Sequence, residues 1–252
     1  MPGTGWLQPM WPAPPRVRAG VTTRELPGVS RPPFAHGNLG DRCGDDPADV
    51  AANRALLVKH APLPADPAWL RQVHGTAVHT PSKGEVPAAP PLADAAYTNE
   101  AGCVLAVLTA DCLPLLVCDA AGTEVAAIHA GWRGLCAGVI EATLAKFQAA
   151  PAALQVWLGP AIAAKSYEVG EEVRAAFLAQ SAAAERAFAP TRPGHWLCDL
   201  YALARLRLEA CGICAVHGGE FDTFTDPRFY SHRREKVGGR FASLIWIEDA
   251  RE

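Results

Sequence analysis

Runs of apolar residues separated by polar turns predict short strands and helices that follow one another in mixed order. Apolar runs of strand length occupy residues 17–23, 103–108, 113–118, 125–128, 154–158, 215–217 and 241–247, with two shorter pieces around Gly75 within 69–80. Apolar residues at helical spacing occupy residues 46–59, 135–148, 171–178 and 199–210. Asp46 and Asp199 are the expected N-caps of the first and last helices, and Pro47 occupies the first helical position. This mixture is typical of an α/β fold.

The segments between these elements indicate one folded unit behind a less ordered start. Residues 27–45 and 81–91 are rich in Pro and predict loops. Residues 1–16 contain Pro and Trp without strand or helix periodicity, which predicts a poorly structured N-terminal segment. Because a single core can extend to about 250 residues, residues 17–252 are expected to form one domain.

Composition limits the partners of this chain. Apolar residues make up 50% of the sequence and charged residues 19%, with a formal net charge of −3, so we expect a packed core and no nucleic-acid partner. The longest apolar stretch, 103–118, is interrupted by Asp111 and Pro114 and is shorter than the roughly 20 residues that span a bilayer. We therefore expect a monomer that acts on a small molecule and does not enter a membrane.

The N-terminus and the cysteines indicate the compartment. The first residues lack the basic start and the continuous apolar segment of a signal peptide. The eight cysteines are dispersed through apolar segments, which is typical of reduced, buried thiols rather than of a disulfide framework. A cytoplasmic location is the expectation.

Three residues with metal-binding side chains, His74, Cys112 and His129, each lie where an apolar run ends in polar residues and a turn former. Two imidazoles and one thiolate form a ligand set for one zinc ion, with the fourth position left to water or substrate. Their spacing is long and unpaired, so they must converge from separate strand ends, as active-site residues do on a rigid scaffold. The alternative is two hydrogen-bonded histidines and one buried thiol.

The same ligand set with an axial thioether would describe a blue-copper site. However, the two methionines, Met1 and Met10, lie in the predicted poorly structured segment, and the eight histidines include no His-x-His pair. Zinc is therefore the expected cofactor. Copper binding in vitro is also expected, because copper stands above zinc in the affinity order of divalent ions.

Charged and aromatic residues near these motifs offer further chemistry. Asp111 is a candidate to orient a ligand imidazole or to move a proton, and its alternative role is that of a turn former before Pro114. Tyr167 can stack on a flat ring or pack in the core. The planar guanidinium of arginine binds phosphate or carboxylate. The candidates are Arg71, Arg133, Arg233 and Arg234, and the alternative for some of them is a solvated or ion-paired side chain.

Two further features concern helix ends. The turn before residues 135–148 predicts that backbone N–H groups near Arg133 face an anion at a helix N-terminus. Cys211 and Cys214 form a single C-x-x-C pair at the end of a predicted helix, and a lone pair in that position argues against a redox or zinc role.

Ordered motifs along most of the chain carry a family resemblance. They are RQVHG at 71–75, TADCLP at 109–114, HAGWRG at 129–134, GPAI at 159–162, SYEVG at 166–170, FYSHRR at 229–234 and GR at 239–240. At these residues the chain resembles the YfiH-type family, whose members are also called laccase-domain proteins, multicopper polyphenol oxidase-like proteins or peptidoglycan editing factors. The resemblance extends from about residue 17 to residue 247.

The resemblance implies a fold and a metal site. The implied fold is a single-domain, four-layer α/β/β/α sandwich with mixed sheets, in which residues 17–252 form the catalytic domain. The implied metal ligands are His74, Cys112 and His129.

The resemblance also suggests substrate-binding residues. It implies that Arg233 and Arg234 lie near the pocket and that Asn38 and Arg54 line the cleft, although a turn asparagine and a helix-surface arginine are the plain alternatives. One departure is EFDT at 220–223, where many members carry a Cys-Thr pair, so a substrate contact of that loop is in doubt.

Zinc lowers the pKa of bound water towards about 7 and polarises leaving groups, so the predicted chemistry is hydrolysis or group transfer. The resemblance implies phosphorolysis of adenosine, inosine, guanosine and methylthioadenosine, together with deamination of adenosine. In this hypothesis Asp111 tunes the metal and Arg133, Arg233 or Arg234 binds phosphate. Three alternatives stay open, namely an editing amidase acting on UDP-muramyl-amino acid precursors, a copper-dependent polyphenol oxidase and a non-catalytic zinc-binding module.

Overall fold

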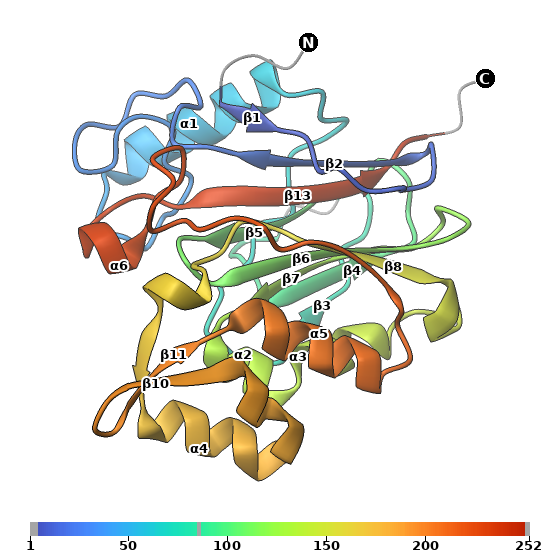
Figure 1. Ribbon diagram of the computed structural model, residues 1–252. Helices are drawn as coiled ribbons and strands as arrows, with labels where there is room; N and C mark the ends of the chain where they lie inside the picture. Colours follow the sequence, from blue (N-terminus) through green and yellow to red (C-terminus); the bar gives the residue numbers. More distant parts are fainter. Residues whose placement is uncertain (1–4, 85–86, 250–252) are drawn as a thin grey trace.

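Two large β-sheets stack face to face between layers of helices in the computed structural model, which describes residues 5–84 and 87–249 (Figure 1). The four-stranded sheet has the order β1 (Trp6–Leu7), β2 (Val17–Thr22), β13 (Phe241–Ile247), β5 (Leu105–Thr109). The six-stranded sheet has the order β12 (Ala215–Gly218), β8 (Leu154–Leu158), β6 (Leu113–Asp119), β7 (Val125–Ala130), β4 (Ala95–Thr98), β3 (Val78–His79). A smaller sheet has the order β10 (Phe188–Arg192), β11 (His195–Cys198), β9 (Glu168–Gly170).

Helices cover the outer faces of both large sheets. The α-helices are α1 (Pro47–His60), α2 (Trp132–Ala137), α3 (Val139–Leu144), α4 (Glu171–Gln180), α5 (Leu200–Ala210) and α6 (His232–Glu235). Short 3₁₀ helices occupy Pro151–Ala153, Ala164–Ser166 and Ala182–Ala187. Figure 1 shows α1 above the four-stranded sheet, and α2, α3 and α5 below the six-stranded one.

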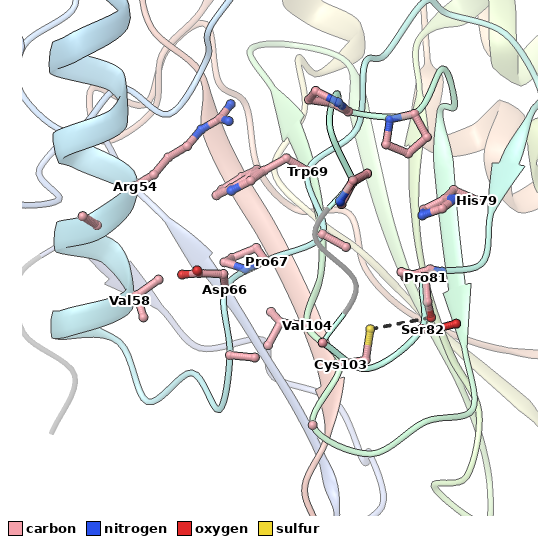
Figure 2. Close-up of a pocket in the computed structure, with 18 of the residues that line it drawn as sticks. Arg54, Val58, Asp66, Pro67, Trp69, His79, Pro81, Ser82, Cys103 and Val104 are labelled. Carbon is pink, nitrogen blue, oxygen red and sulfur yellow. Dashed lines mark hydrogen bonds between the residues drawn. The ribbon is translucent and has the colours of Figure 1, made fainter.

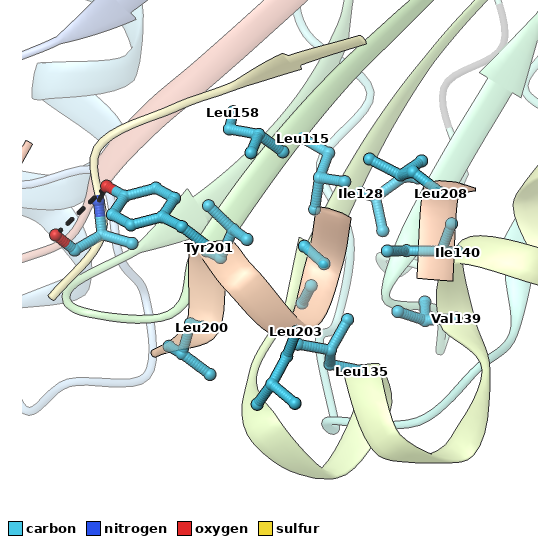
Figure 3. Close-up of a cluster of buried hydrophobic side chains, with 14 of the residues drawn as sticks. Leu115, Ile128, Leu135, Val139, Ile140, Leu158, Leu200, Tyr201, Leu203 and Leu208 are labelled. Carbon is cyan, nitrogen blue, oxygen red and sulfur yellow. Dashed lines mark hydrogen bonds between the residues drawn. The ribbon is translucent and has the colours of Figure 1, made fainter. Parts of the chain in front are cut away.

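Three hydrophobic clusters join these layers. The cluster between the two large sheets contains Leu116 of β6 and Ile245 of β13. The cluster under α1 contains Leu57 of that helix and Leu244 of β13. The third cluster lies between the six-stranded sheet and its helices, where Leu203 of α5 packs with strand residues (Figure 3). The predicted four-layer α/β/β/α arrangement is therefore confirmed.

The six-stranded sheet is mixed, as predicted, because β12 pairs with β8 and β3 pairs with β4 in parallel while the other pairs are antiparallel. The four-stranded sheet is antiparallel throughout. In β6, Leu115 and Val117 face the helices whereas Leu116 and Cys118 face the other sheet. Burial of both faces explains why the sequence shows an unbroken apolar run there rather than an alternation.

The predicted helix boundaries hold where a side chain caps the helix. The Asp46 side chain accepts a hydrogen bond from the Ala48 amide at the start of α1, and Asp199 accepts one from the Ala202 amide at the start of α5. Each of these carboxylates satisfies an amide that the first turn of a helix leaves unpaired.

Two predictions of local structure are wrong, and one strand was not predicted. The single helix expected over 135–148 is broken at Gly138, whose backbone is left-handed with φ of 100°, so two short helices form instead. Of the two strand pieces expected within 69–80, only Val78–His79 pairs as a strand. Strand β4 was not predicted, because the Ala-rich segment Ala95–Thr98 has no strand periodicity and gains its pairing from β7.

Within the segment expected to be poorly structured, Trp6–Leu7 pairs antiparallel with β2. Residues 1–4, 85–86 and 250–252 lie outside the described residues. The expectations for Met1 and its neighbours, for that part of the predicted loop 81–91 and for the end of the predicted domain fall on these residues. In the described parts of the chain, no helix combines the length and the apolar character needed to cross a bilayer.

Candidate metal centre

The structure brings His74, Cys112 and His129 together at one end of the six-stranded sheet. One potential ligand atom of each residue lies within 4.8 Å of the others. The Cys112 Sγ lies 3.7 Å from His74 Nε2, and the centroids of the two imidazole rings are 4.8 Å apart at an angle of 78°. The convergence predicted from the sequence is confirmed.

Strand register explains why Cys112 meets His129. Strands β6 and β7 are antiparallel neighbours in which Leu113 pairs with Ala130 and Pro114 with His129. Cys112 directly precedes β6, so its side chain is placed at the end of the sheet where β7 finishes. The register of these adjacent strands therefore brings the backbones of the two residues close together.

His74 reaches the same point from a loop held by one buried carboxylate. Asp94 is fully buried and accepts hydrogen bonds from the backbone amides of Val73, His74 and Gly75, at 3.1, 2.8 and 2.7 Å. His74 itself has φ of 62°, in the left-handed region that a residue with a side chain rarely occupies. Asp94 therefore stabilises an unfavourable backbone conformation that aims His74 at Cys112.

The same carboxylate orients His129. The His129 Nδ1 lies 2.8 Å from Asp94 Oδ1, and the His129 amide donates to the Asp94 carbonyl at 2.7 Å. When Nδ1 carries the proton, the lone pair on Nε2 is free to bind a metal ion. Burial raises the pKa of Asp94, but the hydrogen bonds from His129, Gly75 and Val73 outweigh it, so the pKa of this carboxyl is lowered. The sequence did not predict Asp94, whose only signal is an acidic residue in an otherwise apolar segment.

Gln72 fixes the loop to the other large sheet. Its side-chain amide donates to the Leu108 carbonyl and accepts from the Leu108 amide, both at 2.8 Å. Because Leu108 belongs to β5 and Asp94 precedes β4, the His74 loop is held between the four-stranded and the six-stranded sheets.

The charged forms of Cys112 and His129 stabilise each other. Loss of solvent raises the pKa of the Cys112 thiol, but the charge of His129 and hydrogen bonds from both imidazoles outweigh this effect, so its pKa is lowered. Burial lowers the pKa of His129, while the Cys112 thiolate and Asp94 raise it by more. The thiolate that a metal requires is thus stabilised near neutral pH.

This donor set fits a zinc ion. Two imidazole nitrogens and a thiolate are the ligand types of three-residue catalytic zinc sites, which leave a coordination position open. His129 is buried, Cys112 is partly exposed and His74 is exposed, so the cluster is accessible from one side. Met10, the one methionine among the described residues, is 83% exposed and offers no axial thioether.

Gly131, in the HAGWRG motif at 129–134, passes so close to the cluster that a side chain does not fit there. A Cβ atom at Gly131 would lie 2.6 Å from His74 Cδ2 and 3.1 Å from Cys112 Sγ. We expect Gly131→Ala to push the ligands apart and to weaken zinc binding by about tenfold or more, as misplaced or unsupported ligands do. Competition with a chromophoric chelator would measure this loss. Gly194→Asn, at a turn where a Cβ meets nothing within 4 Å, is the matched control, and equal zinc affinity in both variants would contradict the prediction.

Asp111 does not take the role of orienting a ligand imidazole, which belongs to Asp94. The Asp111 Oδ1 accepts from Thr223 Oγ1 at 2.6 Å, and its Oδ2 accepts from the Arg233 amide at 2.7 Å. The carboxylate next to Cys112 thus ties distant segments to the candidate metal centre.

Arg233 and Tyr167 lie beside the cluster. The Arg233 guanidinium stacks over the Tyr167 ring at 5.1 Å from its centroid and donates from Nη1 to the Glu168 carbonyl at 2.9 Å. Its Nε and Nη2 groups make no hydrogen bond to the described parts of the chain. Burial, followed by the Cys198 and Cys112 thiols, raises the pKa of Tyr167, so its phenol stays neutral. These two side chains offer a donor group for an anion and a flat ring, and the Tyr167 phenol is close enough to Cys112 to be affected by its charge.

Arg234 and Asn38 were predicted to bind substrate, but their polar atoms are engaged within the protein. The Arg234 guanidinium donates to the carbonyls of Thr223, Phe224 and Phe229. The Asn38 side chain is fully buried and bonds to Gly40, Cys43, Asp45 and the Arg240 amide. Both residues hold loops in place, and the substrate-binding role predicted for them is not supported by these contacts.

Arg54 lies in a different cavity. It lines a space of about 640 Å³ beside α1, together with Val58, Trp69 and His79, and none of the three converging residues is among its described lining (Figure 2). The guanidinium lies 4.3 Å from the Trp69 ring centroid and donates from Nε and Nη2 to the Leu39 carbonyl. The role of Arg54 in substrate binding stays a prediction.

The remaining candidates are Arg133, Arg71 and the pair Cys211 and Cys214. Arg133 is exposed and stacks 4.5 Å from the ring centroid of its neighbour Trp132. The helix that begins there, α2, has only six residues, so it does not provide the extended dipole expected for anion binding. Arg71 is exposed, and Cys211 and Cys214 are free thiols.

The fold and the site define an α/β/β/α protein with an accessible His-Cys-His centre able to hold a metal ion. The family model described as multi-copper polyphenol oxidoreductase laccase matches residues 18–248, and the chain belongs to this family, which includes the YfiH proteins.

Relatives resemble the chain along its whole length. A purine nucleoside phosphorylase of Pseudomonas aeruginosa is 52% identical over 97% of this chain and 99% of its own. The purine nucleoside phosphorylase YfiH of Escherichia coli is 50% identical over 96% and 98%. The crystal structure of the Neisseria meningitidis protein NMB0706 superposes with a TM-score of 0.92 at 42% identity, covering 98% of this chain and 100% of that one. These similarities support an enzyme of the same kind.

Proposed function

We propose that this protein is a zinc-dependent purine nucleoside phosphorylase that acts on adenosine, inosine, guanosine and methylthioadenosine and also deaminates adenosine. The observation that carries the proposal is the identity of about one half, along nearly the whole chain, with proteins named purine nucleoside phosphorylases. The accessible cluster of His74, Cys112 and His129 supplies a reactive centre that fits this chemistry. A nucleoside and phosphate are the proposed partners.

The chain's own residues divide the work of such a reaction. In phosphorolysis the bond between the ribose C1′ and the purine nitrogen breaks, and a phosphate oxygen forms the new bond to C1′. A bound zinc ion would supply Lewis acidity at the reacting groups. Asp94 holds His129 and the His74 loop rigid during the reaction, which favours a preorganised site.

Arg233 is the residue that we assign to phosphate. Two of its nitrogens, Nε and Nη2, keep their N–H groups after the bond from Nη1 to the Glu168 carbonyl, which suits bidentate binding of an oxyanion. Its stacking on Tyr167 fixes the plane of the guanidinium. The partly exposed Tyr167 ring would support the flat purine.

The test is product analysis with the purified, zinc-analysed protein. Inosine with phosphate is expected to give hypoxanthine and ribose 1-phosphate, and omission of phosphate is expected to abolish base release. Adenosine is expected to yield inosine without phosphate. Retained zinc with no conversion of any nucleoside would contradict the proposal, and hydrolysis of a UDP-muramyl-amino acid under those conditions would identify an editing amidase instead. Phenol oxidation that needs added copper would mark the oxidase reaction as secondary.

A further inference from the structure

The Asp111 residue occupies a point where four segments of the chain meet. Its carboxylate accepts from the Thr223 hydroxyl at 2.6 Å and from the Arg233 amide at 2.7 Å, and its carbonyl accepts from the Ile162 amide at 3.0 Å. These bonds join the turn before β6 to the loop 159–163, to the loop 221–226 and to α6. Cys112 follows Asp111 directly in the chain, so the junction lies one peptide from a candidate metal ligand.

Thr223 closes this junction into a ring of hydrogen bonds. Its amide donates to the Ala161 carbonyl at 3.0 Å, while its own carbonyl accepts from Arg234 Nη1 at 2.8 Å. Thr223 is fully buried, and Asp111 is 9% exposed. A bond from a hydroxyl to a carboxylate in such surroundings is short and strong, because little water competes for it.

The backbone at Asp111 needs this support. Its φ of 90° lies in the left-handed region that residues with side chains rarely adopt. A conformation of this kind persists only where neighbouring contacts determine it from several sides. The Thr223 hydroxyl, the Arg233 amide and the Ile162 amide are those contacts, and together they decide where the following Cys112 side chain points.

We infer that Thr223 is a positioning residue that acts through Asp111 to hold the Cys112 thiol and the Arg233 guanidinium in one relative geometry. Arg233 is part of this inference because its backbone amide donates to the second oxygen of the Asp111 carboxylate. The role of its guanidinium in phosphate binding rests on the proposed function. The effect on Cys112 is independent of that function, since it concerns only the candidate metal centre. Two parts of the site that are far apart in the sequence are thereby coupled through one buried hydroxyl.

Thr223→Val tests this inference, because valine keeps the shape of threonine and removes the hydroxyl. We expect its zinc affinity, measured by chelator competition, to fall by about tenfold, as is usual when a partner of a ligand-bearing segment is lost. The KM for phosphate in inosine phosphorolysis is expected to rise several-fold, with a smaller change in kcat. Thr223→Ser keeps the hydroxyl and is expected to restore both values.

A matched control separates positioning from general destabilisation. Thr143 is also fully buried, and its hydroxyl donates to the Val139 carbonyl within α3 at 2.7 Å. Thr143→Val therefore loses one buried hydroxyl bond away from the site and is expected to leave zinc affinity and the KM for phosphate unchanged. If Thr223→Val does not fold, Thr223→Ala removes the same hydroxyl with less bulk and is expected to show the same losses.

The possible results distinguish the role of Thr223 from the proposed phosphorylase function. Unchanged zinc affinity in a folded Thr223→Val or Thr223→Ala protein would overturn the inference, as would equal losses in Thr223→Ser. Absence of phosphorolysis in the unaltered protein would contradict the proposed function, while the zinc measurements would still decide the role of Thr223.

Discussion

Replacement of Cys112 by serine is expected to abolish stoichiometric zinc binding and to lower kcat/KM for inosine phosphorolysis by more than about 100-fold, because loss of an outer partner alone costs 10–100-fold. The thiolate is the one anionic ligand of the cluster, and a neutral hydroxyl does not replace its charge or its softness. Zinc content by elemental analysis and conversion by product chromatography should be measured on the same sample.

Cys214→Ser is the control for this variant, since Cys214 is an exposed free thiol. It is expected to retain zinc and full activity. Loss of zinc from Cys112→Ser with unchanged nucleoside conversion would reject a metal-dependent mechanism. Retention of zinc would show that Cys112 is not a ligand.

Asp94→Asn is expected to lower both zinc affinity and stability. The carboxylate accepts four N–H groups, from Val73, His74, Gly75 and His129, whereas an amide offers one acceptor oxygen and places an NH₂ group against the remaining donors. Zinc affinity should fall by about 10–100-fold. The free energy of unfolding should fall by about 3 kcal/mol, the usual size for one partner removed from a buried charged pair. Chelator competition and urea denaturation of the metal-free protein measure these two quantities.

The pH dependence of this effect has a defined sign. The pKa of Asp94 is lowered in the folded protein, so its contribution to stability is fully present above the unfolded value of about 4 and is lost as the pH falls through the folded value. The difference in unfolding free energy between the unaltered protein and Asp94→Asn should therefore shrink in acid. A difference that grows below pH 4 would be inconsistent with a stabilised carboxylate.

Asp119 provides the matched control for Asp94. It is a buried carboxylate at the other end of β6 that accepts hydrogen bonds from the Thr123 amide and hydroxyl and from the Glu124 amide. Asp119→Asn is expected to destabilise the fold without changing zinc affinity. An equal loss of zinc affinity in both variants would mean that Asp94 acts only through overall stability.

Features that depend on nearby residues could be predicted from the sequence. The N-caps Asp46 and Asp199 act on amides two or three residues away, and the strands Leu154–Leu158 and Phe241–Ile247 are apolar runs bounded by polar turns. Motif context also identified the three residues that converge. Gly138, in contrast, breaks a helix that apolar spacing predicts as continuous, because a left-handed glycine leaves no mark in the pattern of apolar residues.

The partners of polar side chains could not be predicted in the same way. Arg233 and Arg234 are adjacent and chemically identical, yet Arg234 bonds to several loop carbonyls while the Arg233 guanidinium bonds to only one carbonyl among the described residues. Arg54 points into a separate cavity because α1 packs on the other large sheet. Nothing in the residue type or its neighbours distinguishes these outcomes.

The sequence by itself determined the α/β class, the main strands and capped helices, and the identity of the His-Cys-His cluster, because these follow from apolar periodicity, capping chemistry and resemblance to the motifs of a family. Only the tertiary structure decided that Asp94 orients His129 and that Thr223 supports Asp111. These hydrogen bonds join residues that are far apart in the chain, and such pairs become neighbours only when the two sheets and their loops have packed.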